Sequence, residues 1–400
     1  MAIKTINPNQ AQTSIGVEST FGTVAASMKR IYPKEGIDLK IMTEMKEDDS
    51  ESIYLFDQKK TLAGFKSGEC KLVNYVAPRT SQFTTASAPI VGDTGEGVLL
   101  KAVYGGYAAS GSSGIVSATT GSATVDDGGK FAVGQWVLVP VSSQLYPAKV
   151  TAVATNLVSF YPEVASAPSS GSVLVNTENF YLTEDNTQSI SVEHAKAEDS
   201  AVQYRLLGCM TNGTLKVARG EKISFEVDVK AASWEQGSLS ISVTEGTNTQ
   251  TAPMLSVPLT CLLQPVTTKT RVHYSLLSAD IKMDASNVFI EELGGVEGRS
   301  GVARNGKRGI VEATVKMQFD QDQYDRFTAQ TDLFFALWAS KGSGLSKRFV
   351  IADVSNCFFK EQPQISEENG FMYLEGTLVG QLGTVHTTDL SRSPTVLCYG

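Results

Sequence analysis

Histidines, cysteines and carboxylates are the side chains of this chain that could do chemistry, and their spacing predicts no catalytic centre. His194, His273 and His386 lie far apart, and none is within one helical turn of a cysteine, so no zinc pattern is present. The sequence also lacks a G-x-S-x-G elbow, a P-loop and a G-x-G-x-x-G loop. We therefore expect no enzyme, and no catalytic, cofactor-binding or metal-binding residues.

The five cysteines are odd in number and form no C-x-x-C pair. This pattern predicts reduced, mostly buried thiols rather than a disulfide framework. The cysteines are Cys70, Cys209, Cys261, Cys357 and Cys398.

Acidic clusters are the next candidates for chemistry. The stretch DQDQYD at residues 320–325 resembles half of a calcium loop, but it lacks the glycine and the closing glutamate, so it favours a helix cap at Asp320. The run EDDSE at 47–51 predicts a solvated loop, with a cation site as the lesser alternative. The pairs at 291–292 and 367–368 predict exposed carboxylates.

A basic, glycine-rich loop at 294–309 carries Arg299, Arg304, Lys307 and Arg308. Such a loop predicts either a phosphate site or a segment that orders against an acidic neighbouring subunit. Under the second hypothesis, these four residues are candidates for contacts between stacked subunits, as is the polar segment 1–27.

Composition limits the class of protein. The chain has 400 residues, a hydrophobic fraction of 42% and a net charge of −8. The net charge argues against a protein that grips nucleic acid through its phosphates. No apolar run is long enough to span a membrane, and no signal peptide is recognisable, so synthesis in the cytoplasm is expected.

The elements that position these residues are mainly strands. Apolar and polar residues alternate in TLKVARGEKISFEVDV (214–229), in GIVEATVKMQF (309–319) and in ISEENGFMYLEGTLV (365–379), which predicts two hairpins turning at Gly220 and Gly370. Shorter runs at 36–42, 52–56, 69–76, 278–283, 287–291 and 347–351 also predict strands. A helix is expected over 95–104, and a longer one is expected from Asp320 to about Lys341.

Similar strand patterns recur in the two halves of the chain, which predicts a duplicated β-domain; two unrelated β-domains are the alternative. Three short strands between Ser/Gly-rich segments predict a small barrel-like insert in the first copy. The expected organisation is an arm at 1–27, a first domain at 28–107 plus 174–233, the insert at 108–173, a bridge at 234–262, a second domain at 263–390 and a tail at 391–400.

Four segments, in this order, resemble the tail-tube proteins of long, non-contractile-tailed bacteriophages. They are INPNQAQTSIGVESTFGTVAAS with MKRIYPKEGIDLK, then GDTGEGVLLKAVYGGY, YRLLGCMTNGTLKVARGEKISFEVDVK and DIKMDASNVFIEELGG. The resemblance implies a β-sandwich or half-barrel flanked by a helix in each domain. It also implies a virion protein whose copies form rings that stack into a tube, through which double-stranded DNA passes without specific binding.

The partners that the resemblance implies are other copies of the chain, the tape-measure protein, the tail terminator and the distal tail or baseplate proteins, with no membrane. Two domains per chain predict a ring of three copies with pseudo-six-fold symmetry, and a ring of six copies is the alternative. An acidic lumen would repel phosphate. The candidate lumen residues are the polar-face carboxylates Glu226, Asp228, Glu312 and Glu375.

A carbohydrate-binding or adhesion module is the alternative function. It rests on the β-rich insert and its aromatic residues Trp136, Tyr146 and Tyr161.

Overall fold

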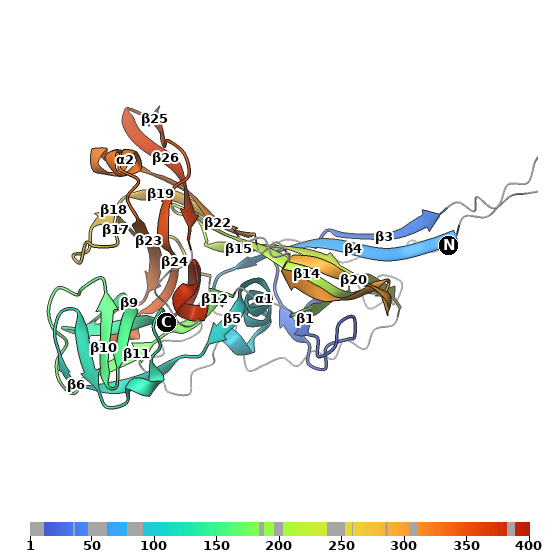
Figure 1. The fold of residues 1–400 in the computed structure, drawn as a ribbon, viewed down its shortest axis with the longest axis horizontal. Helices are drawn as coiled ribbons and strands as arrows, with labels where there is room; N and C mark the ends of the chain where they lie inside the picture. The colour runs from blue at the N-terminus through green and yellow to red at the C-terminus, as the bar shows by residue number, and fades with distance from the viewer. Residues whose placement is uncertain are drawn as a thin grey trace, which may run out of the picture.

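The structure is a computed structural model of the chain. It describes residues 12–34, 37–46, 62–77, 91–183, 188–195, 203–237, 253–257, 259–284, 287–304, 310–381 and 389–400. The fold is mainly β, as predicted. The molecule is elongated, with a closed barrel at one end and the hairpin of β3 (Leu39–Lys46) and β4 (Leu62–Tyr75) extending from the other (Figure 1). The expected strand at 52–56 and the acidic run at 47–51 lie outside the described residues.

Eight antiparallel strands form what we call the central sheet, in the order β3-β4-β15-β14-β19-β22-β26-β25. The remaining six are β14 (Gln203–Ala218), β15 (Ser224–Ala231), β19 (Leu276–Asp284), β22 (Ile310–Gln318), β25 (Gln364–Glu368) and β26 (Phe371–Gly380). Both predicted hairpins are confirmed. Gly220 has a φ of +83° between β14 and β15. Asn369 and Gly370 have φ angles of +54° and +78° between β25 and β26, as a type I′ turn requires.

The same strand order occurs twice in the central sheet. The first half contributes β3-β4-β15-β14 and the second half contributes β19-β22-β26-β25. In each half a helix follows the second of these strands, namely α1 (Gly95–Tyr104) after β4 and α2 (Gln321–Thr328) after β22. The halves join where β14 pairs with β19.

A second sheet layer packs against the central sheet. Its order is β5-β12-β27-β24-β23-β17-β18. Its strands are β5 (Gly105–Ala108), β12 (Glu178–Leu182), β17 (Leu259–Pro265), β18 (His273–Tyr274), β23 (Leu333–Lys341), β24 (Arg348–Phe359) and β27 (Thr395–Tyr399). The expected C-terminal tail is wrong, because every residue of β27 is buried and the strand joins β12 of the first half to β24 of the second. The short helix α3 (Asp389–Arg392) precedes it.

The N-terminal segment is not a free arm. The strand β1 (Gln12–Val17) pairs with β13 (Ile190–Ala195) and with β2 (Lys29–Ile31), and Ile15 is fully buried. The Glu18 carboxylate then accepts hydrogen bonds from the backbone amides of Gly22 and Gly208 and from the hydroxyls of Ser189 and Ser191. The first half of β14 pairs with β13 and with β16 (Ser233–Gln236). The expectation of an irregular segment over 1–27 therefore fails for residues 12–17.

The predicted helix at 95–104 is confirmed as α1, with Thr94 as its N-cap and Gly105 (φ +87°) as its C-cap. The predicted long helix after Asp320 is wrong beyond Thr328. Asp320 does cap α2, accepting a hydrogen bond from the Gln323 amide at 3.1 Å, but residues 333–341 form β23. Side chains of this strand point alternately into two different hydrophobic clusters, so both faces are apolar and the strand carries no alternation in sequence.

Residues between β5 and β12 form a closed six-stranded barrel, which we call the inserted barrel. Its strands are β6 (Gly111–Ala118), β7 (Ser122–Val125), β8 (Trp136–Val141), β9 (Gln144–Ala154), β10 (Leu157–Tyr161) and β11 (Val173–Asn176). The sequence predicts only three of these strands. Short 3-10 turns lie at Val91–Asp93, Gly128–Lys130 and Gly344–Ser346.

One hydrophobic cluster runs through both halves of the chain. It contains Leu72 and Val227 from the first half and Val315, Phe335 and Leu378 from the second. The two halves therefore share one core and one central sheet, where the sequence predicts two domains.

Candidate functional site: the polar face of the central sheet

One face of the central sheet packs into the core and the other is polar. In β15, Phe225, Val227 and Val229 are buried, whereas Glu226 is partly exposed and Asp228 is exposed. Alternate side chains of a strand point to opposite faces, so the pattern in β15 places its charges away from the core. We call the side of the sheet that carries Glu226 the polar face.

The structure brings the four predicted lumen carboxylates onto this one face. Glu226 of β15 lies opposite Thr214, which lies opposite Lys282. Lys282 in turn lies opposite Glu312 of β22. Residues opposite each other share a face, so Glu226 and Glu312 belong to one row across four strands.

The other two carboxylates flank this row. Asp228 follows Glu226 by two residues along β15. Glu375 of β26 lies opposite Lys316, which follows Glu312 by four residues along β22. Even spacing along a strand keeps a side chain on the same face.

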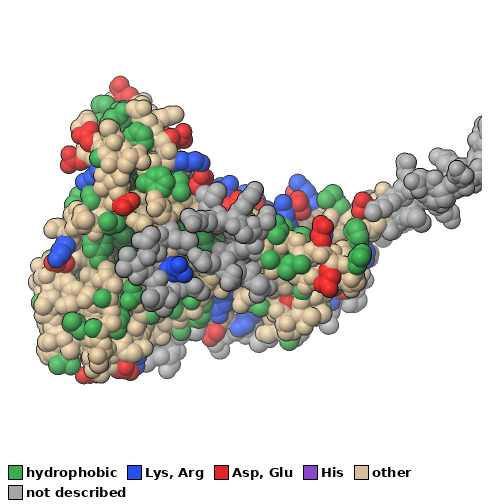
Figure 2. All heavy atoms as spheres, in the orientation of Figure 1, with side chains coloured by type: hydrophobic (Ala, Val, Ile, Leu, Met, Phe, Trp, Pro, Cys, Tyr) green, Lys and Arg blue, Asp and Glu red, His purple; other side chains and the backbone are tan. Residues whose placement is uncertain are grey.

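The polar face is mixed in charge, which corrects the expectation of an acidic surface. Lysines occupy the same face in β4, β14, β15, β19 and β22. They are Lys71, Lys216, Lys230, Lys282 and Lys316. Figure 2 shows acidic and basic side chains close together along the narrow middle of the molecule, where β14 and β15 run. The mixed charge could be read from the sequence, because each lysine, like the carboxylates, alternates with apolar residues along its strand.

Glu226 is the centre of an ion-pair cluster. Its carboxylate lies 2.7 Å from Nζ of Lys71 and 3.0 Å from Nζ of Lys216, and its side chain is 20% exposed. Partial burial acts to raise the pKa of Glu226, but the hydrogen bonds and charges of the two lysines outweigh it, so the net pKa is lowered. Beside this cluster, burial raises the pKa of Asp280, with Glu226 adding to the shift and Lys216 opposing it.

A second set of ion pairs lies on the same face in the second half. Glu312 lies 2.7 Å from Nζ of Lys360, and Lys316 pairs with Glu368. These contacts raise the pKa of both lysines, chiefly through the hydrogen bond that each donates to its carboxylate. The polar face is therefore internally neutralised in both halves.

The basic loop at 294–309 is partly a hairpin. β20 (Asn287–Val296) pairs with β21 (Arg299–Arg304), and the two-residue turn at Glu297 and Gly298 has φ angles of +50° and +73°. The Arg299 guanidinium donates to the Ala232 carbonyl at 2.9 Å and lies 4.5 Å from the centre of the Phe289 ring, so it is engaged within the chain. Arg304 ends β21, and Lys307 and Arg308 lie outside the described residues.

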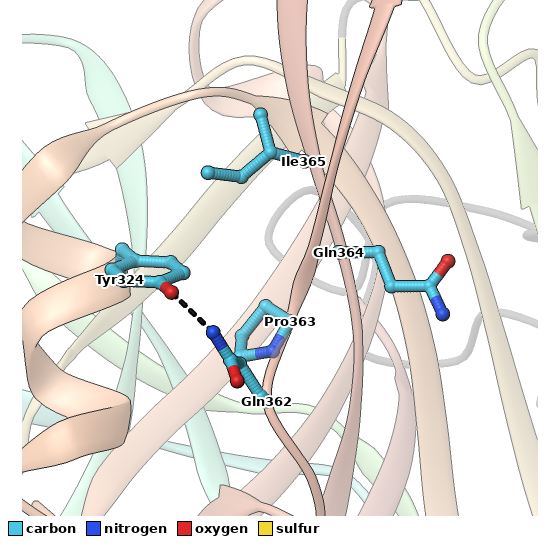
Figure 3. Close-up of a pocket in the computed structure, with 5 residues that line it drawn as sticks. All are labelled: Tyr324, Gln362, Pro363, Gln364 and Ile365. Carbon is cyan, nitrogen blue, oxygen red and sulfur yellow. Dashed lines mark hydrogen bonds between the residues drawn. The ribbon is translucent and has the colours of Figure 1, made fainter.

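An open pocket of about 480 Å³ lies between α2 and the outer edge of β25. Figure 3 shows the Tyr324 ring from α2 facing Gln362, Pro363 and Ile365, with Gln362 donating a hydrogen bond to the Tyr324 hydroxyl. Among the described strands, β25 pairs with β26 alone, so its other edge faces this open space. No pattern in the sequence predicts this pocket.

The equivalent edge of the first half is covered. β19 of the second half pairs with β14, and on the core-side face of β14 Leu215 and Val217 are at most 1% exposed within the hydrophobic core. On the core-side face of β25 and β26, Ile365 and Met372 are 46% and 50% exposed. At its outer edge the second half therefore exposes two apolar side chains, whereas the corresponding side chains of the first half are buried.

The two histidines that the structure describes have partners within the chain. Thr13 hydrogen bonds to the ring of the buried His194 at 3.0 Å, His273 stacks edge-on against Trp338, and His386 lies outside the described residues. The described part of the chain holds no group of three or more His, Cys, Asp or Glu side chains placed to bind a metal ion.

All five cysteines are buried and unpaired, as predicted. Burial raises the pKa of the Cys70 and Cys261 thiols to about 12, which keeps them protonated and weakly nucleophilic.

The aromatic residues behind the adhesion hypothesis do not form an exposed platform. Trp136 is fully buried, and the Tyr161 ring packs edge-on against Phe334 with a centroid distance of 5.2 Å. Tyr146 lies beneath the Arg271 guanidinium at 5.6 Å.

No model of a known protein family matches this chain, and no curated protein matches it. Within the described residues, every helix is too short or too polar to cross a membrane.

Proposed function

We propose that this chain is the structural subunit of a bacteriophage tail tube, in which copies close into rings and the rings stack around a DNA conduit. One observation carries the proposal. The first half ends in an edge that the second half covers, whereas among the described strands the matching edge of the second half is unpaired and exposes the apolar side chains of Ile365 and Met372. A second copy is the partner that would cover it in the same way.

The strand order supports this route of assembly. Among the described strands, β3 at the opposite end of the central sheet pairs with β4 alone, so both outer strands, β3 and β25, have an unpaired edge. Unpaired edges are templates for pairing with another chain. Because β3 and β19 hold equivalent places, β3 of a second copy would add to β25 as β19 adds to β14.

The contact between β25 and β3 is head-to-tail, and such contacts close into rings when the rotation between copies permits. Each copy supplies two equivalent halves, so three copies make a ring of six similar units; a ring of six copies is the alternative.

In such a ring the polar face lines the lumen. Its carboxylates are neutralised by lysines at Glu226 and Glu312, so the surface offers DNA neither a strong repulsion nor a run of free cations to bind. DNA therefore passes without specific binding. The tape-measure protein, the tail terminator and the distal tail or baseplate proteins are the further partners proposed for the tube.

A charge at the bare edge tests this proposal. We expect Ile365→Lys to prevent ring formation, because burying an unpaired ammonium at the junction costs more than the contact returns. The matched control is Val116→Lys, at an apolar side chain of the inserted barrel that is 53% exposed and away from both edges. Electron microscopy and sedimentation velocity report assembly. Rings formed by both variants alike would refute the edge assignment.

A further inference from the structure

The inserted barrel belongs to the first half in sequence but packs against the second half. One hydrophobic cluster contains Trp136, Leu138 and Leu145 of the barrel together with Phe334 and Ile351 of β23 and β24. The Trp136 and Phe334 rings lie 6.1 Å apart. The inserted barrel and the second half therefore share a hydrophobic core instead of meeting only at their surfaces.

A buried carboxylate of β24 is the polar centre of this contact. The Asp353 side chain is fully buried, and its Oδ2 accepts hydrogen bonds from Trp136 Nε1 at 2.5 Å and Lys149 Nζ at 2.9 Å, both from the barrel. Its Oδ1 accepts from the Val396 amide of β27 at 3.1 Å and from the Ser355 hydroxyl at 3.2 Å. Asp353 therefore binds the barrel, β24 and β27 together, and a buried charge so satisfied is costly to expose.

An arginine of the second half also binds the barrel. Arg271 donates to the carbonyl of Pro147 at 2.7 Å and to that of Glu163 at 3.2 Å, and its guanidinium lies 5.9 Å from the centre of the Trp338 ring. Burial lowers its pKa to about 10. Tyr161 of the barrel adds a hydrogen bond to the Pro265 carbonyl at 3.3 Å and accepts one from Gln264 at 2.6 Å.

The connections to the barrel leave little slack. β5 ends at Ala108 and β6 begins at Gly111, while β11 ends at Asn176 and β12 begins at Glu178. A domain on such short connections moves with the strands that carry it.

We propose that the inserted barrel is an intramolecular clasp, which reaches from the first half to the second and holds the two halves of the central sheet at one angle. Among the described strands, the halves meet where β14 pairs with β19 in the central sheet and where β12 pairs with β27 in the second layer, and adjacent strands can twist over a range of tens of degrees. The clasp adds a third, distant contact between the halves and restricts that freedom. This inference does not depend on the proposed function.

Hydrogen exchange on the full chain tests the clasp. The variant Lys149→Met, Arg271→Met removes one cation from each side of the contact, and we expect about ten-fold faster exchange at the β14–β19 junction, Gly213–Ala218, which touches neither residue. The control is Lys360→Met, which removes an exposed ion pair within the second half and should leave junction exchange unchanged. Trp136→Phe, which deletes the indole N–H and keeps an aromatic ring, gives a milder variant should the double variant unfold.

Faster exchange confined to the barrel and to β23 and β24 would overturn the proposal, because the barrel would then be docked without constraining the halves. Unchanged exchange everywhere would overturn it as well. Faster exchange at the junction in both clasp variants, and not in the control, is the supporting result.

Discussion

Glu226→Gln removes the charge that neutralises the polar face in the first half. The substitution keeps the shape of the side chain but leaves Lys71 and Lys216 without the carboxylate that lies 2.7 Å and 3.0 Å from their Nζ atoms. Partly exposed ion pairs contribute about 0.2–1 kcal/mol each. We therefore expect a loss of about 0.4–2 kcal/mol in the free energy of unfolding for the two pairs.

The expected shift in melting temperature is small because the chain is long. An unfolding entropy of roughly 2 cal/mol/K per residue over 400 residues gives about 0.8 kcal/mol per degree, so Tm should fall by about 0.5–2.5 °C if the chain unfolds as one unit. Scanning calorimetry of wild type and variant measures this shift. The matched control is Asp228→Asn on the same strand, which removes none of the ion pairs described above and should change Tm by less.

The effect should depend on pH in one direction. The pKa of Glu226 is lowered in the folded chain, so its contribution is complete above the ordinary glutamate pKa of about 4.3 and is lost as the pH falls through the lowered value. Wild type and Glu226→Gln should therefore differ at pH 7 and converge at an acid pH below the lowered pKa of Glu226. An equal difference at both pH values, or a variant as stable as wild type at pH 7, would refute the ion-pair reasoning.

Three further predictions concern the core, the thiols and the polar face. Phe335→Ala should cost about 3–5 kcal/mol in chemical denaturation, because the ring is fully buried, whereas Phe371→Ala at a 60% exposed ring should cost little; equal costs would contradict the described core. The Cys70 thiol should stay unreactive toward a thiol reagent until the chain unfolds, and rapid native-state labelling would contradict its burial. Changing Glu226 and Asp228 together to Lys should spare ring assembly but slow DNA ejection from phage carrying the variant; unchanged ejection would place these residues outside the lumen.

The sequence predicts the central sheet well because that sheet has one polar, solvent-exposed face and one apolar, buried face. Alternation marked β15, β22 and the hairpin of β25 and β26, and glycines marked both turns. The placement of all four carboxylates on one face followed from the same alternation. The repetition could also be predicted, because strands and a helix follow one another in the same order in each half of the chain.

The second sheet layer was harder to predict, for a physical reason. β23 is buried on both faces and β27 is buried throughout, so neither shows the alternation that marks a half-exposed strand. The run LFFALWA in β23 fits a helix face as well as a buried strand, and only its place between β17 and β24 decides the outcome.

The clasp could not be predicted because its partners are far apart in the chain. Asp353 lies 204 residues from Lys149 and 217 residues from Trp136. One signal was present, namely an aspartate in the otherwise apolar run FVIADV of β24. A charge in such a run indicates a buried partner, but it does not identify that partner.

Electron microscopy of the purified wild-type protein is the most direct test of the tail-tube proposal. We expect rings or stacked tubes with a central pore and three copies in each ring. Six copies per ring would refute the three-copy ring inferred from the two similar halves while leaving the tube intact. A monodisperse monomer at high concentration, with no rings after prolonged incubation, would contradict the proposed function itself.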